Sequence, residues 1–167
     1  MSRGYARVKG RGGGSAHLGL PKSVIGHSNF CLLSPHANKL LIDLGEQYYG
    51  YNNGDLSATW VFMEKRGWKS RDTLNDALRE LEHFGLITQT QEGGLNKTSL
   101  YALTWNKIDK APKGSKWKVG DIPGLWRDLK KPFIKPSAKR RQKKQLRQAC
   151  QSDTYSGTVS RKLRVIR

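Results

Sequence analysis

Cysteine and long apolar runs are both scarce in this sequence of 167 residues. The two cysteines, Cys31 and Cys150, lie far apart and have no paired spacing, which fits a reducing compartment and argues against a disulfide framework. No apolar run approaches the roughly 18 residues needed to span a bilayer, and the basic N-terminus lacks the apolar segment of a secretory signal. These absences predict a cytoplasmic protein without a membrane segment.

Motifs for catalysis and for metal binding are also missing. The four histidines have no metal-ligand spacing with either cysteine: His17, His27, His36 and His83. No Ser/His/Asp arrangement or paired carboxylate stands out, and the glycine-rich start of the chain lacks the Gly-Lys-Ser/Thr of a phosphate loop. We therefore expect no enzyme, no catalytic residues, no metal and no cofactor.

Acidic residues are few, and charge is distributed unevenly along the chain. There are 13 Asp and Glu against 31 Lys and Arg, which gives a net charge of +18. Residues 1–30 contain five basic and no acidic residues, residues 31–109 eight and ten, and residues 110–167 eighteen and three. A near-neutral middle between strongly cationic ends indicates a polyanionic partner, most often nucleic acid. Basic ends that only keep a protein in solution are the alternative.

The clearest helical pattern in the chain spans residues 67–85. Apolar residues fall at i, i+3, i+4, i+7 and i+10 of one helix face: Leu74, Ala77, Leu78, Leu81 and Phe84. Ser70 is a good N-cap, because its hydroxyl can accept a hydrogen bond from the first turn, and Asp72 suits the positive end of the helix dipole. Gly85 suits the left-handed position after the last turn. The pattern predicts a helix between Ser70 and Gly85.

Two further helices are expected upstream. Ser34 and Pro35 suit the N-cap and first position of a helix that ends at Gly50. Its apolar face consists of Ala37, Leu40, Leu41, Leu44 and Tyr48. A second helix is expected over residues 57–66, with Ser57 as its N-cap, and its core residues would be Trp60, Phe62 and Met63. A tight turn at Gly67 would join this helix to the next one as a helix-turn-helix.

Two strands are expected after the third helix, over residues 86–91 and 98–105. The loop between them, 92–97, contains two glycines that allow the positive φ a hairpin needs. A short extended piece is also expected at residues 55–56, before the second helix. The expected order is therefore helix, short strand, helix, turn, helix, strand, loop, strand.

With these elements placed, the sequence resembles the winged-helix family of DNA-binding domains over residues 33–105. The resemblance depends on Ser70-Arg71-Asp72-Thr73-Leu74, Leu78-Arg79-Glu80-Leu81-Glu82 and Gly85-Leu86-Ile87, which look like the recognition helix and first wing strand of bacterial regulators. The ending Leu100-Tyr101-Ala102-Leu103-Thr104-Trp105 looks like small helix-turn-helix proteins of phages and mobile elements. The resemblance implies an α+β winged helix-turn-helix, with three helices and a β-hairpin wing, that binds double-stranded DNA.

The rest of the chain is expected to flank this domain. We predict a flexible basic Gly/Arg-rich arm over 1–30, the winged-helix domain over 31–109, a Trp-containing linker or docking segment over 110–136, and a flexible basic tail over 137–167. In the docking segment, a short helix at 125–130 would place Trp126 and Leu129 against the domain.

If the third helix enters the major groove, its first half faces bases and phosphates. Lys69 and Arg71 would supply cationic donors, and Ser70 and Thr73 hydroxyls for phosphate. Asn75 and Arg79 have the chemistry to read adenine and guanine edges. At the tip of the hairpin, the expected contacts to backbone or minor groove come from Asn96 and Lys97.

The basic tail is the strongest electrostatic feature of the sequence. Six cations fall within nine residues: Lys139, Arg140, Arg141, Lys143, Lys144 and Arg147. Neutralising several phosphates would give steep salt dependence without sequence preference. The tail is therefore expected to hold the protein on DNA while the winged helix selects the site.

Several alternatives remain open at this point. The leading expectation is a nucleoid-associated transcriptional regulator, and a replication or maintenance factor of a phage or plasmid is close to it. The third helix also carries Asp72, Asp76, Glu80 and Glu82, so its exposed face could instead bind a partner protein. RNA could be the ligand of the basic ends. The sequence does not indicate an oligomeric state.

Overall fold

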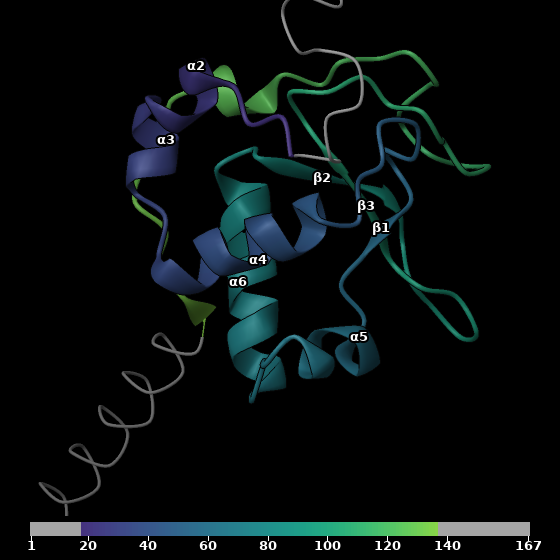
Figure 1. The fold of residues 1–167 in the computed structure, drawn as a ribbon, viewed down its shortest axis with the longest axis horizontal. Helices are drawn as coiled ribbons and strands as arrows, with labels where there is room; N and C mark the ends of the chain where they lie inside the picture. Colours follow the sequence, from purple (N-terminus) through teal and green to yellow (C-terminus); the bar gives the residue numbers. More distant parts are fainter. Residues whose placement is uncertain (1–17, 137–167) are drawn as a thin grey trace, which may run out of the picture. The chain divides into compact units, whose positions relative to one another are not determined.

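The computed structural model describes residues 18–136. The described residues as far as Lys130 belong to one compact unit, and residues 131–136 lie outside it. The described part of this first unit is an α+β fold with five α-helices, one short 3-10 helix and a three-stranded antiparallel sheet (Figure 1). In chain order the elements are α2 (Lys22–Ile25), α3 (Ser28–Cys31), α4 (Pro35–Gly45), β1 (Leu56–Ser57), α5 (Trp60–Lys65), α6 (Arg71–His83), β2 (Ile87–Gln91), β3 (Leu100–Leu103) and η1 (Leu125–Arg127).

The longest helix, α6, forms where the sequence predicts it. The Ser70 hydroxyl accepts a hydrogen bond from the Thr73 amide at 3.4 Å, and Gly85 follows the helix with φ +69°. The apolar stripe packs against α4, with Leu74, Ala77 and Leu81 almost fully buried. In Figure 1, α4 crosses α6, and α5 lies beside the N-terminal end of α6. The core of the unit therefore lies between α4, α6 and the sheet.

Helix α4 begins as expected, with the Ser34 hydroxyl accepting from the Ala37 amide, but it ends at Gly45 rather than near Gly50. The prediction of a longer helix that includes Tyr48 is wrong. The Asn52 side chain binds backbone groups that would be paired within a longer helix: it donates to the Gln47 carbonyl and accepts from the Tyr49 amide. These contacts turn the chain away from the helix axis.

Helix α5 is shorter than predicted, because its first expected residue belongs to the sheet and the helix begins only at Trp60. Ser57 is not an N-cap: it lies in β1, and its backbone amide and carbonyl both bind the side-chain amide of Gln47. Met63 is fully buried. Trp60 and Phe62 are only half-buried, so the expectation that both lie in the core is wrong.

The sheet has the order β1-β3-β2. Strand β3 pairs antiparallel with β1, with Leu56 opposite Tyr101, and with β2, with Ile87 opposite Leu103. A register shift follows Gln89, just before the loop that joins β2 and β3. The expected hairpin and the short strand ahead of the second helix are thus both present.

Segments expected to flank the domain are part of the same unit. Residues 18–30, placed in a flexible arm by the sequence analysis, include α2 and most of α3, with Val24 and Asn29 buried. The Asn29 amide donates to the carbonyls of Phe84, Trp126 and Asp128 at 3.3, 3.0 and 2.7 Å. One buried side chain therefore joins the N-terminal helices to the end of α6 and to η1.

Of the two residues of the docking segment that were predicted to pack against the domain, one is buried and the other is exposed. Trp126 is 7% exposed and packs edge-on against the His27 ring at 5.4 Å. Leu129, expected to dock beside it, is 76% exposed, because the helix ends at Arg127 and the chain continues in an extended conformation.

Candidate nucleic-acid interface

The turn between α5 and α6 is held by one buried carboxylate, Asp43 of α4. Its oxygens accept hydrogen bonds from Lys39 Nζ at 2.7 Å, Arg66 Nε at 2.9 Å and Trp68 Nε1 at 2.8 Å. Burial alone would raise the pKa of Asp43, but the hydrogen bonds from Lys39, Trp68 and Arg66 outweigh it and lower the pKa below its ordinary value. The ionised carboxylate therefore fixes Arg66 and Trp68, the residues on either side of Gly67.

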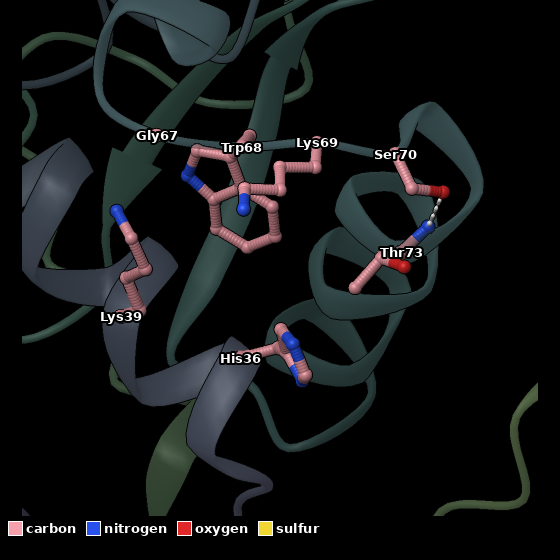
Figure 2. Close-up of a pocket in the computed structure, with 7 residues that line it drawn as sticks. All are labelled: His36, Lys39, Gly67, Trp68, Lys69, Ser70 and Thr73. Carbon is pink, nitrogen blue, oxygen red and sulfur yellow. Dashed lines mark hydrogen bonds between the residues drawn. The ribbon is translucent and has the colours of Figure 1, made fainter.

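A pocket of about 230 Å³ opens at this turn (Figure 2). It is lined by His36, Lys39, Gly67, Trp68, Lys69, Ser70 and Thr73. Figure 2 shows the Trp68 ring between Lys39 of α4 and the first turn of α6, with Lys69 beside it. Three of the predicted DNA-binding residues thus meet at the start of α6: Lys69, Ser70 and Thr73. Lys69 and Ser70 are exposed and Thr73 is partly exposed.

The outward face of α6 presents the remaining predicted residues of that helix. Arg71, Asn75 and Arg79 are all exposed, and they follow one another at helical spacing. The Arg71 guanidinium lies over the Trp60 ring at 5.3 Å from its centroid. This contact between the first residues of α5 and α6 gives Arg71 a defined position while its charge stays in solvent.

Two of the carboxylates on α6 are buried, so the helix exposes fewer acidic groups than its sequence suggests. Asp76 is 8% exposed and Glu80 is 3% exposed. Glu80 accepts from the Ser34 amide at 2.6 Å and from the Ser34 hydroxyl at 2.7 Å, so it also caps the start of α4. Only Asp72 and Glu82 remain exposed among the four acidic residues of the proposed protein-binding face.

The β2–β3 loop lies on the same side of the unit as α5 and the start of α6 (Figure 1). An open groove of about 360 Å³ separates them, and its walls include Trp60, Asn75 and Lys97. Asn96 and Lys97 are both exposed, and Asn96 has φ +60°. The structure therefore brings Asn75 of α6 and Lys97 of the loop, which are far apart in sequence, to one groove.

Other predicted contacts lie outside the described residues. They are the six cations of the basic tail: Lys139, Arg140, Arg141, Lys143, Lys144 and Arg147. The first 17 residues of the predicted arm are outside as well.

Two residues at this surface were not predicted from the sequence. Trp60 was assigned to the core, yet it supports Arg71 and lines the groove. Leu95, at the tip of the loop, is 96% exposed. The signal for Leu95 was present, since it is an apolar residue in a loop otherwise made of glycine and polar residues. No pattern in the sequence distinguishes Trp60 from a buried tryptophan.

Within residues 18–136, no group of His, Cys, Asp and Glu side chains is arranged to hold a metal ion. In the same part of the chain, every helix is too short or too polar to cross a membrane. A scan against protein-family models and searches of curated proteins and of solved structures found no match for this chain. A function must therefore be inferred from the residues themselves.

Proposed function

We propose that the unit is a winged helix that binds double-stranded DNA with sequence preference, and that its role is transcriptional regulation in the bacterial cytoplasm. The element order from α4 to β3 and the sheet order β1-β3-β2 support this assignment. Helix α6 would be the recognition helix, and the β2–β3 loop would be the wing. The observation that carries the proposal is the shared groove, which is lined by both Asn75 of α6 and Lys97 of the wing.

The two halves of the surface would contact different parts of the DNA. At the start of α6, Lys69, Ser70 and Thr73 offer a cation and two hydroxyls to the phosphate backbone. Further along the same face, Asn75 and Arg79 would reach base edges in the major groove, where asparagine pairs with adenine and arginine with guanine. Arg71, supported by Trp60, would contact the backbone next to them.

The burial of Asp76 and Glu80 favours DNA over a basic protein partner at this face. Those carboxylates are turned to the protein interior, so residues 69–79, the turn and the first half of α6, expose three cations and a single carboxylate, Asp72. The other exposed carboxylate of the helix, Glu82, lies in its last turn. Asp72 lies in the first turn, where it stabilises the helix dipole. The basic arm over residues 1–30 and the basic tail over residues 137–167 would add non-specific phosphate contacts.

Arg71→Ala in the full chain tests the proposal, and Arg127→Ala is a matched control. Both arginines are exposed and stack on a tryptophan, Arg127 on Trp126 at 4.8 Å, so each substitution removes one charge and one cation–π contact. Affinity for random-sequence duplex DNA, single-stranded DNA and RNA is measured by fluorescence anisotropy across a salt series.

The wild-type chain should bind the duplex most tightly. Arg71→Ala should weaken duplex binding and reduce the slope of log affinity against log salt by about 1, whereas Arg127→Ala should change neither. Equal losses in the two variants would mean that net charge alone drives binding. Tighter binding to RNA, or no binding to any nucleic acid, would replace the proposal with the RNA-binding or the protein-interaction alternative.

A further inference from the structure

Leu95 is an apolar residue whose exposed position adds no hydrophobic stabilisation to the fold. At 96% exposed, it has the highest exposed fraction among the exposed large apolar residues of the described chain, ahead of Leu129 at 76%. It occupies the tip of the β2–β3 loop, next to Asn96 and Lys97. A leucine in this position makes no contribution to the core, so its apolar surface is free for an external partner.

The loop holds this leucine in a defined position. The Gly94 amide donates to the Lys97 carbonyl at 2.9 Å, and the Lys97 amide donates to the Gly94 carbonyl at 3.1 Å. Leu95 and Asn96 are the two central residues of this tight turn, and Asn96 takes the positive φ that it needs. Below it, the Gly93 amide donates to the Ser99 hydroxyl at 3.1 Å. The leucine therefore extends from a closed, hydrogen-bonded turn.

The backbone beside Leu95 is also open to close approach. A side chain at Gly94 would meet no atom of the protein within 4 Å, and its φ is not positive, so neither packing nor conformation requires glycine there. An external surface can therefore come against bare backbone at Gly94. The loop carries Glu92 at its base, next to β2, and Lys97 two residues after Leu95, so the charge nearest the leucine in sequence is positive and matches a phosphate-rich partner.

We propose that Leu95 is a minor-groove wedge: with the wing in the groove, its side chain inserts between two base pairs and kinks the duplex. This proposal rests on the function proposed above, since it needs α6 in the adjacent major groove. Apolar side chains, leucine among them, unstack base steps in this way in minor-groove-binding proteins and bend DNA by roughly 20–90°. Lys97 would neutralise a phosphate beside the kink, and Asn96 would lie at the edges of the bases.

The wedge has a consequence for the choice of sequence. Pyrimidine–purine steps such as TA and CA unstack most easily, so the base step under Leu95 should be one of these, without a hydrogen bond that reads it directly. The preferred ligand is therefore a duplex with two features. The base pairs under α6 are recognised by direct contacts, and the base-pair step under the wing is one that unstacks easily.

The test compares Leu95→Ala with Leu95→Met and with Leu129→Ala in the full chain. Methionine keeps an apolar wedge, and Leu129→Ala removes the same side chain from an exposed site outside the loop. The probe is a duplex of about 30 base pairs carrying the sequence that the wild-type chain selects from a random pool, with a donor and an acceptor dye at its ends. Anisotropy gives affinity, and energy transfer between the dyes gives the bend.

The wild-type chain, Leu95→Met and Leu129→Ala should all bend the duplex and bind it with similar affinity. Leu95→Ala should lose the bend and bind about tenfold more weakly, because the buried apolar surface is lost. A straight duplex with wild-type protein, or the same bend and affinity with Leu95→Ala, would overturn the wedge while leaving DNA binding intact. Failure of the wild-type chain to select or bind any duplex would overturn the proposed function and the wedge with it.

Discussion

Asp43→Ala should destabilise the first unit more than the loss of an ordinary surface ion pair. The side chain of Asp43 is 6% exposed and accepts three hydrogen bonds, whereas its partners Lys39 and Arg66 have side chains that are 43% and 29% exposed. After the substitution, water can solvate the two cations, so losing each pair costs about 0.5–1 kcal/mol. Water cannot reach the buried indole N–H of Trp68, and leaving this donor without an acceptor costs about 1–3 kcal/mol.

The free energy of unfolding should therefore fall by about 2–5 kcal/mol at neutral pH, as measured by urea denaturation followed by tryptophan fluorescence. Asp55→Ala is the matched control, because Asp55 forms one ion pair with Lys110 at 2.7 Å and both side chains are largely in solvent. Its loss should cost clearly less than that of Asp43, because water solvates both partners in the folded chain. Equal effects of Asp43→Ala and Asp55→Ala would refute the structural role given to Asp43.

The same residue predicts a dependence on pH. The pKa of Asp43 is lowered in the folded chain from its ordinary value of 3.8, so the ionised carboxylate stabilises the fold at neutral pH. This contribution is complete above the unfolded pKa and is lost as pH falls through the folded one. The difference in stability between wild type and Asp43→Ala should thus shrink below about pH 4. A difference that stays constant down to the acid transition would contradict this electrostatic explanation.

Two further substitutions test how the segments around α6 are joined. Asn29→Ala should destabilise the unit by about 2–4 kcal/mol and speed amide exchange in residues 22–31, since it leaves buried carbonyls without their donor; unchanged exchange there would argue against this role. Gly85→Ala should cost about 2 kcal/mol in urea denaturation, because Gly85 has φ +69° and an added Cβ would lie 2.5 Å from the Leu125 carbonyl oxygen; a neutral result would mean that the chain relaxes freely at this position.

Local signals in the sequence were sufficient for the elements that have strong caps and a regular period. Helix α6 has an apolar stripe of five residues between Ser70 and Gly85, and both ends are where these residues predict them. The hairpin follows in the same way from two strand-like segments with glycines between them. At both places local preference and tertiary packing favour the same conformation.

The errors occur where a distant side chain decides the local structure. Ser57 is a good N-cap by itself, but Gln47 binds its backbone and holds it in the sheet. Residues 18–30 have no periodicity, and their order depends on Asn29 reaching carbonyls about 55 to 99 positions away. Such long-range hydrogen bonds have no signature in a single sequence.

The candidate site was predictable as a set of residues but not as a surface. The exposure of Asn75 and Arg79 follows from the helical period, since they lie away from the apolar stripe, whereas Arg71 lies at its edge, seven residues before Leu78. The burial of Asp76 and Glu80 does not follow from the period; Glu80, for example, is buried where it binds Ser34 at the start of α4. The groove between α6 and the wing could be recognised only from the three-dimensional structure, because its residues are far apart in sequence.

The most direct test of the account is a selection of bound sequences from a random duplex pool, carried out with the full wild-type chain and with Asn75→Ala. The wild-type chain should enrich a motif, and Asn75→Ala should lose the preference at one base pair, at an adenine in the major groove, while keeping the rest. Arg127→Ala should return the wild-type motif. No enriched motif with the wild-type chain, or the same motif from Asn75→Ala, would contradict the claim that α6 reads DNA.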